Sequence, residues 1–352
     1  MYFDVMPKTN RKDLFGFDAL CDEVEKAIDT NRMVVIKGLR RTGKTSLMNV
    51  AYNEIKHQKL FVDAREIEKG RNATYEHFGK AFYEFIRENN AYEKAKSYLE
   101  GLEVYVKLNF KEKKALAELA KRIDSMMEDR GQYFCLFIDE AQLLKPYGFD
   151  DFLAFVYDRL KRIKIVIAGS EIGILDQFIG SEAKGALYGR PKKEINLRRF
   201  KHEESIAFLQ NGFKQLKMEI SENEIEKTVG TLDGVAGWLT FYGFYRKELS
   251  SEKALSKTLE ESSKIVALEI KGFLGARPSA TGRYKLLLQG LSQSPLSWNE
   301  IKNFIIIKSG EPIPDSRLSN LLNQLTEYAF IEEKEGKYML GDPIIKEALS
   351  RI

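Results

Sequence analysis

The sequence is poor in cysteine and histidine, and the few that it has follow no metal-ligand spacing. The two cysteines, Cys21 and Cys135, stand in apolar contexts, which indicates reduced thiols and predicts a cytoplasmic location. The three histidines, His57, His77 and His202, form no ligand pattern. The scarcity of these ligands argues against a Cys/His metal site.

Long hydrophobic runs are also absent. No segment approaches the roughly 20 apolar residues that a membrane span needs, and residues 1–13 lack the apolar core of a signal peptide. Neither sign of charge dominates, since 56 Lys and Arg stand against 52 Asp and Glu, for a net charge of +4. That balance requires neither a nucleic acid nor a membrane as partner, and we expect an intracellular protein without membrane contact.

What the sequence does contain is an alternation of apolar strands and helices. Its 352 residues, 43% hydrophobic and 31% charged, suffice for two or three packed domains. Strands are predicted at 33–37, 59–67, 133–140, 163–170 and 192–197, with helices at 18–29, 44–55 and 111–130 and a charged helical region ending near residue 90. Segment 102–110 alternates apolar and polar residues, which predicts an exposed strand or hairpin. Alternating strands and helices are typical of an α/β fold with a parallel sheet.

The pattern changes after residue 200. Residues 201–279 show only helical periodicity. Residues 280–352 show three short helices and a hairpin that turns at Glu335-Gly336, which is the element order of a winged helix. Ser297 and Glu300 have the spacing of a capping box and predict the start of the second helix. The sequence therefore predicts an α/β core at 1–200, an all-helical lid at 201–279 and a winged-helix domain at 280–352.

The clearest functional motif is Gly-x-x-x-x-Gly-Lys-Thr at residues 38–45, between the first strand and the next helix. Such a loop lets backbone N–H groups face phosphate oxygens, and the helix adds its positive end. Lys44 is predicted to reach the β- and γ-phosphates, and Thr45 to hold Mg²⁺ through its hydroxyl. The strand and helix context disfavours a turn without ligand. The predicted nucleotide-binding residues here are Gly38, Leu39, Arg40, Arg41, Thr42, Gly43, Lys44, Thr45 and Ser46.

Two acidic residues end the apolar strand at 133–140. Asp139 can position the Mg²⁺ ion through a bound water. Glu140 can orient and deprotonate an attacking water, although a carboxylate at that point could instead cap the next helix. The Asp-Glu pair favours hydrolysis over phosphoryl transfer to a small molecule.

Other polar residues allow two interpretations each. Ser170 ends the next strand and is either a γ-phosphate sensor or a helix cap. Arg190 precedes the last strand and either contacts the γ-phosphate, in its own chain or a neighbour's, or is a solvated charge in a basic stretch. Arg40 and Arg41 lie within the phosphate loop and either contact nucleotide or face solvent.

Six motifs carry a family resemblance. They are PKTNRKDLF (7–15), GLRRTGKTS (38–46), FIDEAQ (137–142), AGSEIGIL (168–175), LYGR (187–190) and GWLTFYGF (237–244). In this order they resemble the archaeal ATPase family, in the STAND branch of the AAA+ class of P-loop NTPases. The resemblance covers nearly the whole chain. It implies a five-stranded core, a helical lid, a C-terminal winged helix, ATP or ADP with Mg²⁺, and a switch between nucleotide states.

The same resemblance implies nucleotide contacts at Phe15 and Gly16 and at Ala236 and Gly237, and the chain departs from the family near both. Phe17 stands where relatives carry an arginine beside the adenine, and it either packs on the base or enters the core. Ala236 replaces the proline of the lid motif, which would hold the turn rigid. Alanine predicts a softer turn and weaker sensing of nucleotide by the lid.

Three functions compete at this stage. The first is an ATP-hydrolysing switch that acts on an unidentified protein partner, the second an ATP-regulated DNA-binding protein, and the third a nucleotide-binding protein with negligible turnover, which Glu140 disfavours. Residues 281–352 carry nine Lys or Arg and nine Asp or Glu, whereas DNA readers concentrate positive charge. The third helix still offers groups that could read bases, namely Arg317, Asn320, Asn323 and Gln324. The equal numbers of acidic and basic residues favour a protein partner over DNA.

Overall fold

The structure is a computed structural model that describes residues 1–89, 112–180 and 185–352. The hairpin or strand predicted at 102–110 lies outside the described residues. None of the helices in the described ranges has both the length and the apolar character that a membrane span requires.

A five-stranded parallel sheet forms the core, as predicted, in the order β2-β3-β4-β1-β5. Its strands are β1 (Met33–Gly38), β2 (Gln58–Asp63), β3 (Phe134–Asp139), β4 (Ile163–Gly169) and β5 (Lys193–Leu197). The three central strands are buried along their whole length, which explains why their sequences are continuous apolar runs.

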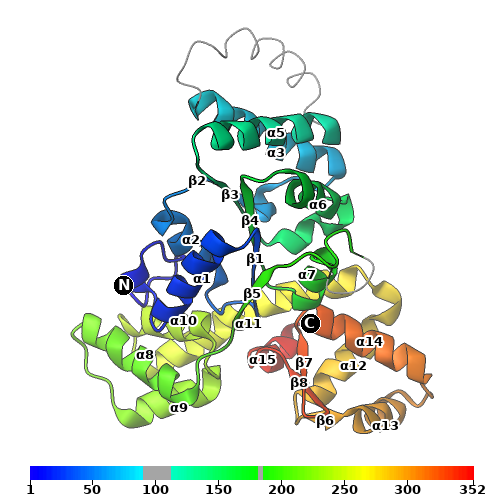
Figure 1. Cartoon of the computed structure of the whole chain (residues 1–352). Helices are drawn as coiled ribbons and strands as arrows, with labels where there is room; N and C mark the ends of the chain where they lie inside the picture. Colours follow the sequence, from blue (N-terminus) through cyan, green and yellow to red (C-terminus); the bar gives the residue numbers. More distant parts are fainter. Residues whose placement is uncertain (90–111, 181–184) are drawn as a thin grey trace.

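Helices cover both faces of this sheet (Figure 1). Val34 and Ile36 of β1 face α1 (Asp18–Thr30) and α2 (Lys44–Glu54). Met33 and Val35 face the opposite layer. That layer consists of α3 (Arg71–Asn89), α5 (Lys113–Asp129), the 3₁₀ helix η4 (Ala141–Tyr147), α6 (Asp150–Arg159) and α7 (Ile172–Phe178). Alternate residues of one strand thus supply two separate apolar layers, as the period of two requires.

The ends of β2 and β3 differ from the sequence prediction. β2 ends at Asp63, four residues before the predicted end, because the Asp63 carboxylate accepts a hydrogen bond from the Arg65 N–H at 3.0 Å and closes the turn η2 (Ala64–Glu66). Asp63 pairs in register with Asp139, the last residue of β3. Glu140 leaves β3 with a φ of +51°, a conformation that a side chain adopts at a cost. Two aspartates therefore lie next to each other at the carboxyl edge of the sheet.

Residues after the sheet are helical, as predicted. They form α8 (His202–Gln215), α9 (Glu222–Leu232), α10 (Ala236–Arg246) and α11 (Ser251–Gly275). The first three make a lid beside α1, and α11 runs from the lid to the C-terminal part (Figure 1). We keep the divisions at residues 200 and 279 as a proposal.

The C-terminal part is a winged helix. After η5 (Pro278–Ala280) it contains α12 (Thr281–Leu291), β6 (Leu296–Ser297), α13 (Trp298–Ser309), α14 (Asp315–Glu327), β7 (Ile331–Lys334), β8 (Lys337–Leu340), α15 (Ile345–Ala348) and η6 (Leu349–Arg351). The capping box at Ser297 and Glu300 is present, and the hairpin turns at Glu335 and Gly336, which both have positive φ. The sequence prediction missed β6 and α15, which are too short to show a periodicity.

Candidate nucleotide site

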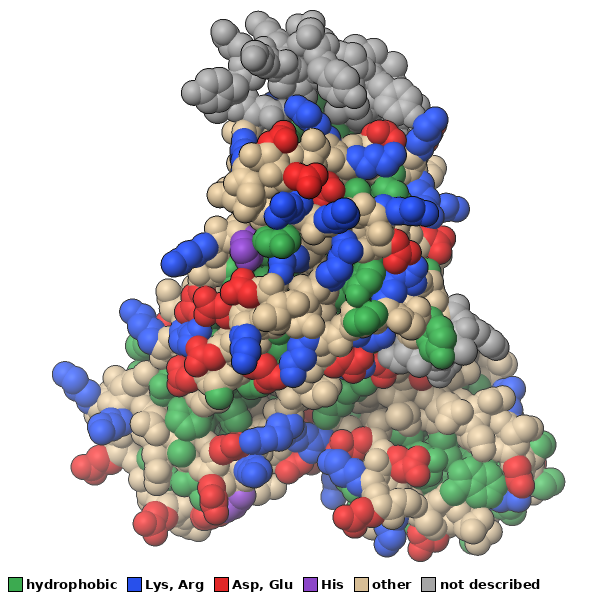
Figure 2. Space-filling model, viewed as in Figure 1, with side chains coloured by type: hydrophobic (Ala, Val, Ile, Leu, Met, Phe, Trp, Pro, Cys, Tyr) green, Lys and Arg blue, Asp and Glu red, His purple; other side chains and the backbone are tan. Residues whose placement is uncertain are grey.

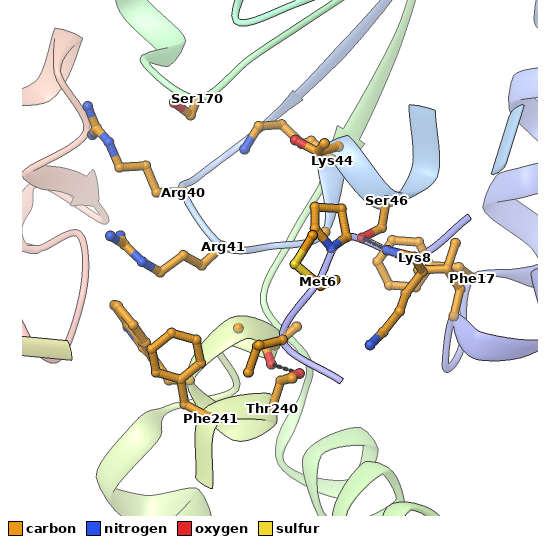
Figure 3. Close-up of a pocket in the computed structure, with 18 of the residues that line it drawn as sticks. Met6, Lys8, Phe17, Arg40, Arg41, Lys44, Ser46, Ser170, Thr240 and Phe241 are labelled. Carbon is orange, nitrogen blue, oxygen red and sulfur yellow. Dashed lines mark hydrogen bonds between the residues drawn. The ribbon is translucent and has the colours of Figure 1, made fainter. Parts of the chain in front are cut away.

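A cavity of about 530 Å³ lies at the carboxyl edge of the sheet. Figure 3 shows how four parts of the chain meet there. The N-terminal segment brings Met6 and Lys8, the loop after β1 and the start of α2 bring Arg40 and Lys44, the end of β4 brings Ser170, and α10 brings Phe241. Ligands of open parallel sheets commonly bind at this edge, so the position of the cavity agrees with the sequence motif.

The loop at 38–46 has the geometry that a phosphate ligand needs. Gly43 has a φ of +99°, and a Cβ on it would lie 2.9 Å from the Phe17 ring. A Cβ on Gly38 would lie 2.7 Å from the Leu197 carbonyl oxygen. Both positions therefore require glycine, and the loop is drawn close to its neighbours. Phe17 is buried, as the core interpretation predicted, and its ring also packs against the loop at Gly43.

Lys44 is the first residue of α2 and its side chain is buried in the cavity wall. The Nζ atom donates to the Leu39 carbonyl oxygen at 2.6 Å. Burial lowers the pKa of this ammonium to about 8, with Glu140 and Asp139 opposing the shift. Within residues 1–89, 112–180 and 185–352, the Leu39 carbonyl is the one hydrogen-bond acceptor of this ammonium. Phosphate oxygens would add stronger compensation for its burial.

Thr45 and Asp139 bring two oxygen donors together. The Thr45 hydroxyl donates to Asp139 Oδ2 at 2.7 Å. Burial raises the pKa of the Asp139 carboxyl, and the bond from Thr45 opposes that shift. A divalent cation such as Mg²⁺ prefers hydroxyl and carboxylate oxygens and would stabilise this buried charge. The two residues therefore fit the metal that the sequence predicted for them.

Glu140 and Ser170 form one cluster. Ser170 Oγ donates to Glu140 Oε2 at 2.9 Å, and Gln142 Nε2 donates to the same oxygen at 2.5 Å. Neither side chain caps a helix: Glu140 is at the N-cap position of η4 but accepts no hydrogen bond from its backbone N–H groups, and the N-cap of α7 is Glu171, not Ser170. The helix-cap alternatives are therefore wrong for both. Their functional roles remain predictions.

Arg40 and Arg41 do not face solvent. Arg40 Nη1 donates to the Tyr328 carbonyl oxygen at 2.8 Å and Nη2 to Glu171 Oε1 at 2.7 Å. Arg41 Nη2 donates to Glu269 Oε1 at 2.6 Å. Figure 3 shows both side chains leaving the loop away from Lys44, toward the C-terminal part of the chain. Both also line the cavity.

Arg41 belongs to a further contact between the loop, the lid and the winged helix. Its guanidinium lies 4.2 Å from the centre of the Trp238 ring, and its backbone oxygen accepts from the Gly237 N–H at 3.0 Å. The Trp238 indole donates to Asp342 at 3.0 Å. Burial raises the pKa of that carboxyl, and the Arg41 charge opposes the shift.

The other predicted site residues divide into two groups. Phe15, Ser46, Ala236 and Gly237 line the cavity. Arg190 does not: it pairs with Asp158, Nε to Oδ1 at 2.8 Å, and is absent from the cavity wall. The expected γ-phosphate contact of Arg190 within its own chain is therefore not supported by this arrangement, because α6 supplies a carboxylate that holds the guanidinium elsewhere.

Gly16, Leu39 and Thr42 are also outside the wall of this cavity. Leu39 and Thr42 hold the loop and the Lys44 side chain in place, since the Leu39 carbonyl accepts from both Lys44 Nζ and Thr42 Oγ1. Gly16 has a φ of +72°, which turns the chain between Phe15 and α1.

Sequence reasoning missed several residues of the site. Arg65 lines the cavity beside Asp139, and Gln142 holds Glu140. Lys8 N–H donates to Ser46 Oγ at 2.9 Å, so the N-terminal segment is attached to α2. Gln142 lies in the motif FIDEAQ and Lys8 in the motif PKTNRKDLF, and these motifs could have pointed to them. Arg65 stands in none of the motifs, and its place in the site depends on a contact with Asp139, 74 residues away.

Comparisons with known proteins agree with this geometry. A family model described as an ATPase domain predominantly from Archaea matches residues 21–240. The chain belongs to this family of archaeal ATPases. A second model, the C-terminal winged helix-turn-helix domain of MCM proteins, matches residues 278–340. No curated protein matches the chain.

Solved structures are similar over the whole length of this archaeal ATPase. The Walker-type ATPase PABY2304 of Pyrococcus abyssi has 28% identity, and the match covers 100% of both chains with a TM-score of 0.82. The ORC2 protein of Aeropyrum pernix, solved with ADPNP and ADP, has 12% identity, coverage of 99% and 96%, and a TM-score of 0.61. The ORC1 protein of the same organism, in complex with DNA, has 13% identity, coverage of 99% and 96%, and a TM-score of 0.50. The two ORC matches show the fold alone.

Proposed function

We propose that this chain hydrolyses ATP with Mg²⁺ and that its nucleotide state controls the position of a winged helix that contacts a protein partner. Within this proposal the chain is a member of the STAND branch of the AAA+ class. The family supports ATP as the ligand, and the nucleotide complexes of the ORC2 protein support ATP and ADP as alternating ligands.

The hydrolytic part of the proposal rests on three groups. Lys44 binds the β- and γ-phosphates, and Thr45 and Asp139 hold Mg²⁺, which neutralises phosphate charge when bound. Glu140 accepts the proton of the attacking water. The hydrogen bonds to the Glu140 carboxylate from Gln142 Nε2, Ser170 Oγ and the Ser170 N–H all fall on Oε2. This leaves Oε1 for that water, while Ser170 and Gln142 fix the orientation of the carboxylate.

The switch part rests on one observation: the phosphate loop itself touches the winged helix. The Arg40 guanidinium bonds the Tyr328 carbonyl at the end of α14. Arg41 approaches Asp342, beyond β8, at 3.9 Å and is paired with Glu269 of α11. A ligand shifts a conformation only through different affinity for its two states. Both arginines belong to the phosphate loop, so a loop that closes on phosphate moves their guanidinium groups relative to Tyr328 and Asp342. That movement is the differential effect that the switch requires.

Hydrogen exchange tests the switch. In the full chain, amides around Tyr328 and Asp342 should exchange faster with a slowly hydrolysed ATP analogue than with ADP. Arg40→Ala should reduce that difference, whereas Arg198→Ala, which removes an exposed arginine paired with Glu204, should keep it. Equal exchange of the winged helix with both nucleotides would contradict the switch while leaving hydrolysis intact.

A second candidate is regulated binding to DNA through α14. Arg317, Asn320 and Asn323 are exposed on this helix, and the ORC1 protein with the same fold was solved with DNA. The balanced charge of residues 281–352 disfavours it. Figure 2 shows basic and acidic side chains interspersed on the face that it presents. Steady-state ATP turnover measured with and without duplex DNA separates the two candidates.

A further inference from the structure

Arg65 is a cation of the cavity that the sequence motifs do not contain. It lies in the turn η2 after β2, where Asp63 and Asp139 end neighbouring strands in register. Its Nη2 atom is 2.5 Å from Asp63 Oδ2 and 3.5 Å from Asp139 Oδ2. It lines the same cavity as Lys44 and Glu140. One guanidinium therefore bridges a carboxylate of its own turn and the carboxylate that fits Mg²⁺.

The other arginines near the loop are committed elsewhere. Arg40 and Arg41 have side chains that are 21% and 18% exposed, and their partners lie on α7, α11 and the winged helix. Arg190 is held by Asp158 outside the cavity. The Arg65 side chain is 53% exposed, so it can change rotamer without disturbing packing. Its main anchor, Asp63, accepts from Nε at 2.8 Å and belongs to the same turn. Of these four arginines, Arg65 combines a place in the cavity wall with the most exposed side chain.

The charges around Arg65 give this movement a direction. Asp139 is buried, and the 3.5 Å contact with Arg65 supplies part of its counter-charge. A divalent cation on Thr45 and Asp139 would take over that function and repel the guanidinium. The strongest new anion within reach would then be the terminal phosphate, and a guanidinium pairs well with phosphate through two parallel N–H groups.

We propose that Arg65 is the residue through which the site distinguishes ATP from ADP: its guanidinium leaves Asp139 when the nucleotide binds and donates to the γ-phosphate. The inference rests on the proposed binding of ATP at Lys44. Arg65 thereby performs, from the neighbouring strand of the same chain, the charge stabilisation that the sequence suggested for Arg190. No covalent bond forms or breaks in this step, since the guanidinium stays protonated and only exchanges one anionic partner for another.

Calorimetry on the full chain tests the proposal with two probes, adenosine 5′-O-(3-thiotriphosphate) and ADP, each with Mg²⁺. Arg65→Ala should weaken binding of the triphosphate roughly 10- to 100-fold, the range for hydrogen bonds to a charged group, and change ADP affinity by less than about twofold. Arg65→Lys should retain part of the triphosphate affinity, because it keeps the charge but loses the planar fork.

Arg198→Ala is the matched control, since Arg198 is 57% exposed and pairs with Glu204 much as Arg65 pairs with Asp63. It should leave both affinities unchanged. Equal losses of triphosphate and ADP in Arg65→Ala would overturn the proposal, since they indicate a structural contribution of the turn. Unchanged affinities for both would overturn it as well. If the unaltered chain binds neither probe, the proposed function itself fails, and the inference fails with it.

Discussion

At the scale of single residues, the Lys44 ammonium enters the cavity from the first turn of α2 and donates to the Leu39 carbonyl. Lys44→Ala should remove most of the nucleotide affinity, because it removes the charge that we propose to pair with the β- and γ-phosphates. The unfolding temperature without nucleotide should not fall, since a buried charge is removed with it. Calorimetry measures the nucleotide affinity, and a thermal melt measures the unfolding temperature. Lys253→Ala, at an exposed lysine of α11, serves as the control. If the Lys44→Ala variant binds nucleotide as tightly as the parent, the site lies elsewhere.

Glu140→Gln separates chemistry from binding. Glutamine keeps the shape and can still accept from Ser170 and Gln142, but it cannot take a proton from water. Turnover should fall by roughly 100-fold or more, with nucleotide affinity largely kept. A phosphate-release assay combined with calorimetry measures both quantities. Equal turnover in the variant and the parent would remove Glu140 from the mechanism.

Residue by residue, the sequence predicts those parts of the site that are local. Gly43, Lys44, Thr45 and Asp139 could be predicted because a strand, a loop of fixed spacing and a helix bring them together. Arg65 could not, because its position depends on the register between β2 and β3. The end of β2 and the start of β3 are 71 residues apart in the chain (134 − 63), with α3 and α5 between them. Nor could the Asp158 partner of Arg190 be predicted, since nothing in the spacing of α6 and β5 relates the two side chains.

At the scale of elements, α10 begins where the lid meets the phosphate loop. Ala236 is its first residue, and the next N–H, that of Gly237, donates to the Arg41 carbonyl oxygen. Ala236→Pro should therefore stabilise the folded chain, by about 0.4–1 kcal/mol, because proline is well suited to the first helical position and Val235 before it has an extended ψ of 104°.

The same substitution should also increase the thermal shift that ADP produces, because a rigid turn keeps the Gly237 N–H in place against the loop. A thermal melt with and without ADP measures both effects, and Ala236→Gly should change them in the opposite direction. If Ala236→Pro alters neither the melt nor the ADP shift, the turn at the start of α10 is not where the lid senses nucleotide.

Element boundaries show where periodicity was a poor guide. The five strands and the lid helices were predicted because their apolar patterns are long. β2 was predicted four residues too long, since KLFVDAREI is apolar enough to continue as a strand and the Asp63 carboxylate bond to the Arg65 N–H, which ends it, leaves no pattern in the sequence. β6 has two residues and forms only because the chain brings it beside β8, so it leaves no pattern in the sequence.

At the scale of the whole molecule, one helix connects the lid to the winged helix. α11 spans Ser251–Gly275 and carries Glu269, the carboxylate that pairs with Arg41. Because the loop contacts both α11 and the winged helix, we expect ATP turnover to respond to whatever binds the winged helix. The proposed protein partner predicts that duplex DNA changes turnover by less than about twofold.

A steady-state ATPase assay with duplex DNA at low and physiological salt measures this response. Strong stimulation by DNA would favour the second candidate, and Arg317→Ala, on the exposed face of α14, should then abolish it. Stimulation that survives Arg317→Ala would indicate a DNA contact elsewhere on the chain.

The segment around Phe3 packs into the lid, and this contact has a consequence for the order of folding. The Phe3 ring is buried between α8 and α10, beside Phe208 and Phe213 and against Gly243. Phe3 and Gly243 are 240 residues apart in the chain (243 − 3), so this contact closes a very long loop and forms late. During synthesis, the segment around Phe3 leaves the ribosome long before the residues of α10 against which it packs. Pulsed hydrogen exchange during refolding should therefore show the central strands β1, β3 and β4 protected before α8 and α10.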